Sequence, residues 1–395
     1  MGIGTICKAL DAGGYALKFW GVSALDRYLT LPPLPYGWLA TNADIVALVR
    51  AFEGLRFPGP ALADAALDLE ESCWYFRCLE PEEAPRASYR LLSLTQDIKT
   101  RRFQDPLGIY PCLRELAERP LGRDKAPPWW EGLNPEADYY QAALEGALIL
   151  ARYGGEGAVP LSSLGLSLTA LPRTGSPNPE WQRLLLKSLL VSKRPDRGFK
   201  LLKAAGLVEA LWPELLRLDE VDHSKECHPE GNGWNHTLET FRYRKPLSPK
   251  EPRYDFRLSL GLLLHDVGKP LSAARGKHPF ASHAELGAEL ASRFLTRLGF
   301  DEALINDIRY LVRNHMLPAA LPRVPLHKHR DILASPLFPT LLELYRCDEA
   351  SSFKGLEGYY RSAAAYQGYL KKCRPPAALR SVPYINGKGN HRYPG

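Results

Sequence analysis

An apolar run that ends in a histidine and an aspartate limits the folds open to this chain more than any other feature. Leu260-Gly-Leu-Leu-Leu264 is followed directly by His265-Asp266, and then by Gly268 and Pro270. The run predicts a buried helix, and burying the carboxylate behind it is costly unless a cation compensates. Adjacent side chains reach one ion only where a helix ends or bends, and Gly268 and Pro270 predict such an end.

Four more potential metal ligands flank this pair along the chain: His236, His283, His315 and Asp348. They fall on several expected helices, and no cysteine accompanies them. A lone histidine is more often structural than a ligand, but a set of imidazoles and carboxylates reverses that expectation. Such a set suits a divalent ion that stays open to water and phosphate, rather than a closed structural zinc. The sequence therefore predicts a divalent metal ion as cofactor, with Mn, Ni, Co, Fe and Mg all left open.

The amino-acid composition indicates the cellular compartment and the kinds of binding partner to expect. The seven cysteines are scattered and form no Cys-x-x-Cys pair, which favours reduced thiols in a cytoplasmic protein. No secretory signal is visible, and no apolar stretch approaches the roughly 20 residues that a bilayer requires. The net charge of +7 favours anionic partners, so the candidates are a phosphorylated small molecule, a nucleotide, and tRNA or other RNA. Oligomeric state leaves no trace in the sequence.

With 395 residues, the chain is too long for one hydrophobic core and should form several domains. Its pattern predicts an α+β protein. Residues 1–125 alternate short β-prone pieces with Pro- and Gly-rich turns, 126–218 turn helical, 219–370 are all helical, and 371–395 form a basic tail.

Within the helical part, Asn178 followed by Pro179 predicts the start of a helix to Leu190, and Gly206 predicts a left-handed helix end. The region with the metal ligands predicts five helices: one through His236, one ending at His265-Asp266, one starting near Ser282, one through Ile308 to His315, and one from Leu337 to Asp348.

The ordered set His236, His265-Asp266 and Asp348 resembles the metal site of the HD superfamily of phosphohydrolases, and His-Asp-x-Gly-Lys is that family's most specific local motif. The resemblance implies that these four residues hold the metal and that Asp266 also orients the attacking water. The implied reaction is hydrolysis of a phosphomonoester or phosphodiester.

Three further residues match positions of that family. Lys269 matches a lysine that meets a phosphate oxygen, and His283 and His315 match histidines that bind substrate phosphate or a second metal. His228, in His228-Pro-Glu-Gly-Asn, resembles a segment that helps to shape the pocket of HD domains attached to bacterial tRNA nucleotidyltransferases. His228 and His278 are therefore secondary candidates.

The upstream half resembles class II tRNA nucleotidyltransferases and bacterial poly(A) polymerases. The helical stretch from Trp181 to Leu215 is similar to that family's neck helices. The resemblance implies a small nucleotidyltransferase-like head over 1–125, a helical, RNA-binding-like neck over 126–218, an HD domain over 219–370 and a truncated tail.

The head departs from this family where the polymerase chemistry should lie. Family members carry two aspartates, one residue apart, that hold catalytic magnesium, and the matching positions here are Tyr36 and Trp38. Neither side chain can bridge metal ions between nucleophile and leaving group. We therefore expect nucleotidyl transfer to be lost and the old cleft to be filled by aromatic residues such as Trp20. Asp44 is the one nearby carboxylate that a shifted alignment would offer, and one carboxylate is insufficient.

Three functions stay open at this point. The first is a metal-dependent phosphohydrolase that acts on a nucleotide or an RNA end. The second is a working tRNA nucleotidyltransferase or poly(A) polymerase that adds nucleotides to RNA 3′ ends. The third is a non-catalytic RNA-binding relative that keeps the HD domain as a scaffold.

Overall fold

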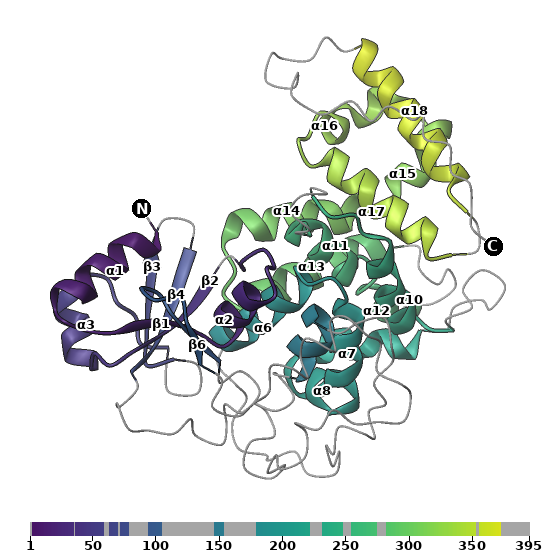
Figure 1. The fold of residues 1–395 in the computed structure, drawn as a ribbon. Coiled ribbons are helices and arrows are strands. Elements are labelled where there is room, and N and C mark those ends of the chain that lie inside the picture. Colours follow the sequence, from purple (N-terminus) through teal and green to yellow (C-terminus); the bar gives the residue numbers. More distant parts are fainter. Residues whose placement is uncertain are drawn as a thin grey trace, which may run out of the picture.

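The computed structural model describes eleven stretches of the chain. They cover residues 2–34, 36–58, 63–69, 72–78, 94–104, 146–153, 179–221, 231–247, 254–274, 282–352 and 355–372. The predicted α+β class is confirmed, with a mixed sheet in the N-terminal part and helices in the rest (Figure 1). His228, His278, the predicted basic tail beyond 372 and the whole stretch 105–145 lie outside the described residues.

In its described residues, the N-terminal part forms a six-stranded sheet with three helices. Its elements are α1 (Ile3–Ala12), β1 (Leu17–Trp20), α2 (Val22–Tyr28), β2 (Tyr36–Thr41), α3 (Ile45–Ala51), β3 (Ala65–Leu69), β4 (Ser72–Cys78), β5 (Thr95–Asp97) and β6 (Phe103–Gln104). The strand order is β3-β4-β2-β1-β5-β6; β2 and β4 run parallel and the other neighbours antiparallel. Tyr36 pairs with Cys73 and Trp38 with Tyr75, so both aromatic positions lie in the middle of the sheet.

A set of short helices follows the sheet. They are the π-helix η3 (Ile149–Tyr153), α6 (Pro179–Leu190), α7 (Pro195–Ala204), α8 (Leu207–Leu211), α9 (Pro213–Leu216) and the 3-10 helix η5 (Arg217–Glu220). The predicted helix start at Pro179 is confirmed. Gly206 has φ 70° between α7 and α8, as the sequence predicts for a left-handed position.

The C-terminal half is all helical in its described residues. It contains α10 (Gly233–Thr240), η6 (Phe241–Tyr243), α11 (Phe256–Leu264), α12 (Lys269–Ala273), α13 (His283–Arg297), α14 (Glu302–Asn314), α15 (Leu317–Ala320), η7 (Leu321–Arg323), η8 (Leu326–His329), α16 (Arg330–Leu333), α17 (Phe338–Ala350) and α18 (Glu357–Lys372). All five helices predicted around the metal ligands are present. No helix among the described residues has both the length and the apolar character needed to cross a bilayer.

Arginines join the neck helices to the C-terminal half by binding carbonyls at helix ends. Arg183 of α6 donates to Leu298 O and Gly299 O at the end of α13, at 2.9 and 2.7 Å. Arg244 is buried and donates to Leu190 O, at the end of α6, at 2.6 Å. A cation at these ends complements the helix dipole and satisfies carbonyls that lack an intrahelical partner.

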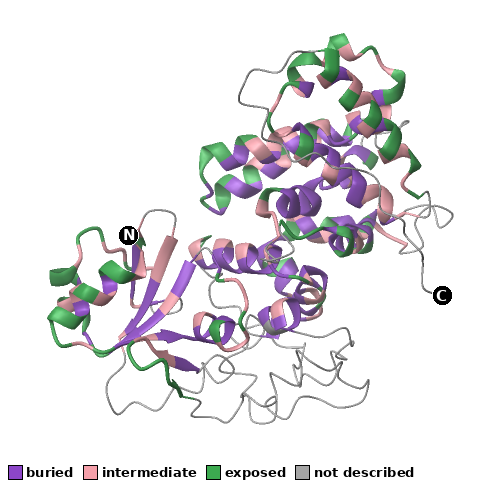
Figure 2. Ribbon diagram, turned by 45° about the horizontal axis from the view of Figure 1, so that its top comes forward, coloured by how far each residue is buried: buried purple, intermediate pink, exposed green. Residues whose placement is uncertain are grey.

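One cluster of buried side chains runs from the sheet through α6 and α7 into α11, α13 and α17 (Figure 2). The neck and the C-terminal helices therefore share a continuous core. The exact domain boundaries stay predictions.

Candidate metal centre

The end of α11 places His265 and Asp266 side by side in the interior. Asp255 starts this helix, because its carboxylate accepts from Arg257 N and Leu258 N. The apolar residues that follow bury the helix on all sides, and it ends at Leu264. His265 and Asp266 then lie in a tight turn before α12, with 1% and 2% of their surface exposed. The helix end predicted from Gly268 and Pro270 is confirmed.

Gly268 allows this turn to touch the start of α13. A Cβ atom at Gly268 would lie 2.1 Å from His283 O and 2.5 Å from Gly287 N. Only glycine therefore fits between the two segments, and its φ of −82° shows that close approach, rather than backbone conformation, requires it. The contact brings His283, the first residue of α13, against the turn that carries Asp266.

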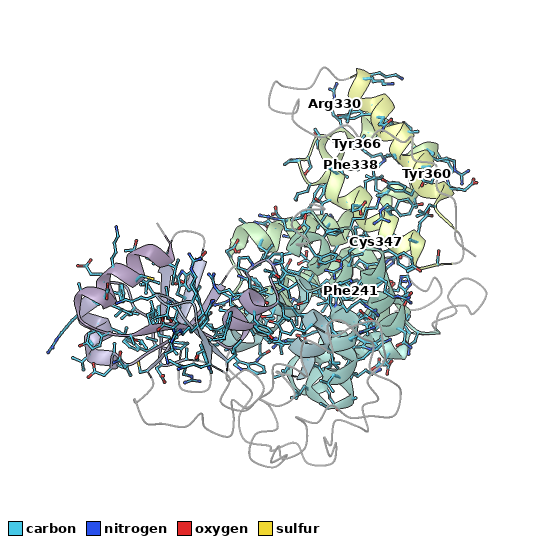
Figure 3. The ribbon with its side chains drawn as sticks, viewed as in Figure 1. Phe241, Arg330, Phe338, Cys347, Tyr360 and Tyr366 are labelled. Carbon is cyan, nitrogen blue, oxygen red and sulfur yellow. The ribbon has the colours of Figure 1, made fainter. Side chains whose placement is uncertain are left out.

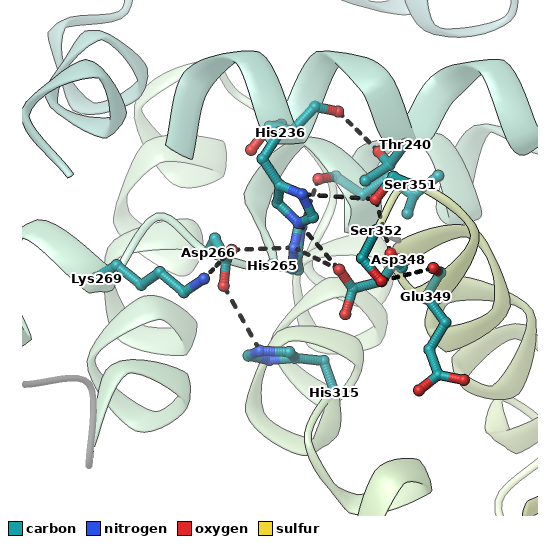
Figure 4. A network of polar contacts seen from close by, with 12 residues as sticks. His236, Thr240, His265, Asp266, Lys269, His315, Asp348, Glu349, Ser351 and Ser352 are labelled. Carbon is teal, nitrogen blue, oxygen red and sulfur yellow. Dashed lines mark hydrogen bonds and ion pairs between the residues drawn. The ribbon is translucent and has the colours of Figure 1, made fainter. Parts of the chain in front are cut away.

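His236, His265, Asp266 and Asp348 form one group of converging side chains (Figure 4). His236 Nε2 lies 2.9 Å from Asp348 Oδ1, and His265 Nε2 lies 3.2 Å from Asp266 Oδ2 and 3.9 Å from Asp348 Oδ1. They come from α10, the turn after α11, and α17. The Asp348 side chain is 28% exposed, so this side of the group reaches solvent.

A second group forms on the other oxygen of Asp266. His283 Nε2 and His315 Nε2 lie 3.6 and 3.8 Å from Asp266 Oδ1, and 3.0 Å from each other. Lys269 Nζ lies 2.6 Å from Asp266 Oδ2, and its side chain is 17% exposed. Asp266 thus stands between two groups of histidines, beside one lysine.

Backbone carbonyls orient two of the imidazoles. His265 Nδ1 lies 2.8 Å from Leu262 O, and His315 Nδ1 lies 2.7 Å from Val312 O. Since a carbonyl only accepts, Nδ1 of each ring donates, and the lone pair of Nε2 faces the site. Histidines that bind metals are usually oriented by such a contact.

The charges of the site also suit a cation. Burial, with the nearby His265, lowers the pKa of His315 to about 4, so its imidazole is neutral at neutral pH. Burial acts to raise the pKa of Asp266, but its interactions with His265 and with the Lys269 ammonium outweigh burial and hold that pKa well below its usual range. Burial likewise acts to raise the pKa of Asp348, and its hydrogen bond to His236 reverses the effect. Neutral imidazoles and ionised carboxylates are the forms that bind a metal.

Two buried atoms test whether the residues fit a metal ion. His265 Nε2 and Asp266 Oδ2 are shielded from solvent and lie 3.2 Å apart. Because His265 Nδ1 donates to Leu262 O, both atoms present lone pairs, and Lys269 Nζ lies 2.6 Å from Asp266 Oδ2, on the carboxylate side. A bound cation would satisfy both, since each offers a lone pair to the same space. Nitrogen and oxygen donors without sulfur fit a borderline or hard divalent ion.

The structure brings together seven residues predicted from the sequence: His236, His265, Asp266, Lys269, His283, His315 and Asp348. Four supporting positions were not predicted from the sequence: the Leu262 and Val312 carbonyls, Gly287, and Ser351, whose Oγ lies 3.5 Å from His236 Nδ1. Backbone contacts leave no signal in side-chain identity.

The described head lacks a comparable group. The two sets of three potential ligands found among the described residues are His236-His265-Asp266 and Asp266-His283-His315. Tyr36 hydrogen-bonds to Ser188 of α6, and Trp38 stacks on Tyr75, with ring centroids 4.9 Å apart. Asp44 is used as the N-cap of α3, where it accepts from Ala47 N at 2.7 Å.

Asp26 is tied to the neck. Arg152 donates to both its carboxylate oxygens, at 2.7 and 2.8 Å, and the Tyr153 hydroxyl lies 2.8 Å from Asp26 Oδ1. Asp26 is therefore engaged in a buried ion pair, and Asp44 in a helix cap.

Comparison with known proteins agrees with this geometry. Residues 233–338 match the HD domain family, a range that includes every predicted site residue in the described structure except Asp348. The chain is 34% identical to an A-adding tRNA nucleotidyltransferase of Deinococcus radiodurans over 45% of this chain and 41% of that protein. It is 31% identical to a CC-adding tRNA nucleotidyltransferase of Thermus thermophilus over 50% of this chain and 45% of that protein.

A bifunctional uridylyltransferase/uridylyl-removing enzyme of Mycobacterium tuberculosis is 31% identical over 60% of this chain and 29% of that protein. The chain thus spans less than half the length of each of these relatives. Among solved structures, the CCA-adding enzyme of Bacillus stearothermophilus aligns over 93% of this chain and 81% of its own, with a TM-score of 0.52 and 14% identity. That likeness is one of fold.

Proposed function

We propose that this chain, which carries an HD domain on a tRNA nucleotidyltransferase-like scaffold, is a metal-dependent phosphohydrolase whose polymerase site is lost. Its expected substrates are phosphomonoesters or phosphodiesters of nucleotides or RNA ends. The observation that carries the proposal is the position of Asp266, buried between two groups of histidines and next to Lys269.

In this proposal His236, His265, Asp266 and Asp348 hold a divalent ion, which lowers the pKa of water and polarises a phosphoryl oxygen when bound. Asp266 would orient the attacking water with Oδ1, which lies 3.6 and 3.8 Å from the Nε2 atoms of His283 and His315. Lys269 is the partly exposed cation at the site and neutralises charge that develops on the phosphoryl oxygens.

The name of one relative includes a removal activity, which supports hydrolysis as the proposed reaction. The Mycobacterium tuberculosis protein is a uridylyltransferase and also a uridylyl-removing enzyme. Removing a nucleotidyl group cleaves a phosphate ester, which is the reaction class proposed here.

The second candidate is nucleotide addition to RNA 3′ ends, which the names of the Deinococcus and Thermus relatives favour. The packing of the head opposes it. Tyr36 and Trp38 occupy the positions expected for the metal-binding aspartates and are engaged with Ser188 and Tyr75. Placing two magnesium ions there would require carboxylates that the described residues of this cleft do not supply.

The deciding experiment uses protein stripped of metal and reloaded separately with Mn, Ni, Co, Fe or Mg. We expect hydrolysis of a generic phosphoester, such as p-nitrophenyl phosphate or its bis ester, with at least one metal and none with the stripped protein. Inactivity with every metal and both esters would refute the proposal.

A parallel assay with labelled CTP or ATP and tRNA tests the second candidate, because only a polymerase lengthens the 3′ end. RNA binding without either activity would favour the third possibility, a non-catalytic relative.

A further inference from the structure

The part of the helical domain farthest from the sheet carries more basic than acidic residues. We call residues 317–337 together with α18 the outer lobe (Figure 1). It contains six lysines and arginines but two acidic residues, Asp331 and Glu357. The six cations are Arg323, Lys328, Arg330, Arg361, Lys371 and Lys372. All six are exposed, and none forms an ion pair within the described part of the chain.

Three of these cations, Arg361, Lys371 and Lys372, lie on α18, and the other three lie on the segment 317–337 that packs against it. The helix begins next to the end of α17, where Tyr359 N donates to Glu349 at 2.8 Å. Farther along, Ser362 Oγ donates to Pro318 O at 2.6 Å, and the Tyr369 hydroxyl contacts Arg330 O at 3.5 Å. Figure 3 shows Tyr360 and Arg330 at separate places along this lobe. Arg361 is therefore near the inner end, and Arg330, Lys371 and Lys372 are near the outer end.

The exposed face of α18 also offers groups that contact bases. Tyr360 is 64% exposed, and Gln367 and Lys371 follow it at spacings that keep one helix face. An exposed aromatic ring beside cations suits a single-stranded nucleic acid, whose bases stack while its phosphates meet lysine and arginine. A membrane-surface helix would instead expose several large apolar side chains, and Tyr360 is the one such residue among the described positions of the lobe.

The lobe is continuous in sequence with elements of the candidate site. His315 lies two residues before it, and α17 begins at Phe338, whose ring lies 4.4 Å from that of Tyr366, and runs back to Asp348. Ten residues of helix separate Phe338 from Asp348, which corresponds to about 15 Å at 1.5 Å per residue. A stacked strand covers that distance in roughly four nucleotides at about 3.4 Å each.

We propose that the outer lobe binds the sugar-phosphate backbone of RNA and leads its end to the metal centre. Binding rests on the lobe alone, whereas delivery of an end for cleavage rests on the phosphohydrolase proposed above. The phosphate contacts set affinity without reading sequence.

The test measures binding of a fluorescein-labelled tRNA transcript by anisotropy in the presence of EDTA, so that catalysis plays no part. The variant is Lys328→Gln/Arg330→Gln/Lys371→Gln. Its control, Lys8→Gln/Arg50→Gln/Arg293→Gln, removes the same charge from exposed positions on α1, α3 and α13. We expect the lobe variant to bind at least about tenfold more weakly at low salt. The slope of the logarithm of the binding constant against the logarithm of the salt concentration should be shallower by roughly 2, because each of the three lost phosphate contacts to a single strand contributes about 0.7.

Three results would overturn the proposal: no RNA binding by the unmodified chain, equal weakening in both triple variants, or binding of the unmodified chain to phosphatidylserine vesicles but not to RNA. If RNA binding depends on the lobe while phosphoester hydrolysis is absent, the proposal of an RNA-binding surface is supported and the proposal of a phosphohydrolase is refuted.

Discussion

His265 Nε2 and Asp266 Oδ2 lie 3.2 Å apart although the two residues are consecutive, because α11 ends at Leu264 and the chain turns. In a continuing helix, neighbouring side chains would diverge by about 100°. The turn leaves the other oxygen of Asp266 facing His283 and His315. One carboxylate therefore connects both groups of potential ligands.

Asp266→Asn should abolish hydrolysis and lower metal occupancy. The amide keeps the shape of the side chain but loses the charge that faces both groups of histidines. Changes in residues that only support metal ligands cost about 10–100-fold in affinity or activity, and loss of a ligand shared by the whole site should exceed that. Elemental analysis and phosphoester hydrolysis measure the two effects. Glu302→Gln, at an exposed position, is the control, and full activity in Asp266→Asn would remove Asp266 from the mechanism.

His236→Ala and His315→Ala should differ in their effects on metal binding. His236 belongs to the group with Asp348, and His315 to the group with His283. If each group holds an ion, each variant should lose about half of the bound metal. If His283 and His315 contact substrate instead, His315→Ala should keep its metal and raise KM. Titration of the stripped proteins with Mn or Co, monitored by calorimetry, distinguishes these outcomes, and unchanged metal binding in His236→Ala would contradict the ligand assignment.

Gly268→Ala should damage the site by geometry alone. The added methyl group would meet His283 O and Gly287 N at 2.1 and 2.5 Å, so the turn and α13 must separate. Overpacking of this kind costs at least about 1–3 kcal/mol and would displace His283 from Asp266. Gly368→Ala is the matched control, because nothing lies within 4 Å of its added atom. Gly268→Ala should lower stability in urea and weaken metal binding, whereas the control should keep the metal binding of the parent and be as stable or, by up to about 1 kcal/mol, more stable, because alanine is the better helix former.

The positions of the ligands could be predicted from the sequence because the buried helix, its end and the flanking helices each leave a local pattern. His265-Asp266 after an apolar run and Ser282 before α13 are examples. Other features depend on residues that are distant in sequence. The fit of Gly268 against Gly287, the binding of Arg244 to the end of α6, and the hydrogen bond from Tyr36 to Ser188 appear only when the helices and strands are packed.

Tyr36→Phe should reduce the loss of stability at alkaline pH. Burial raises the pKa of Tyr36 well above its usual value of 10, and the hydrogen bond to Ser188 offsets only part of that effect. Below about pH 10, Tyr36 is protonated in both the folded and the unfolded protein, and its contribution to the free energy of unfolding is fully present. As the pH rises from there toward the folded pKa, the hydroxyl ionises in the unfolded protein only, so this contribution is lost. One such group changes the slope of the free energy of unfolding against pH by up to about 1.4 kcal/mol per pH unit.

At neutral pH the same substitution should cost only about 0.5–1.5 kcal/mol, since Ser188 Oγ keeps its bond to Leu184 O at 2.6 Å. Urea unfolding between pH 7 and 11 measures both effects, with Tyr360→Phe as the exposed control. An alkaline slope in Tyr36→Phe equal to that of the parent would show that Tyr36 is not held between β2 and α6 as the structure places it.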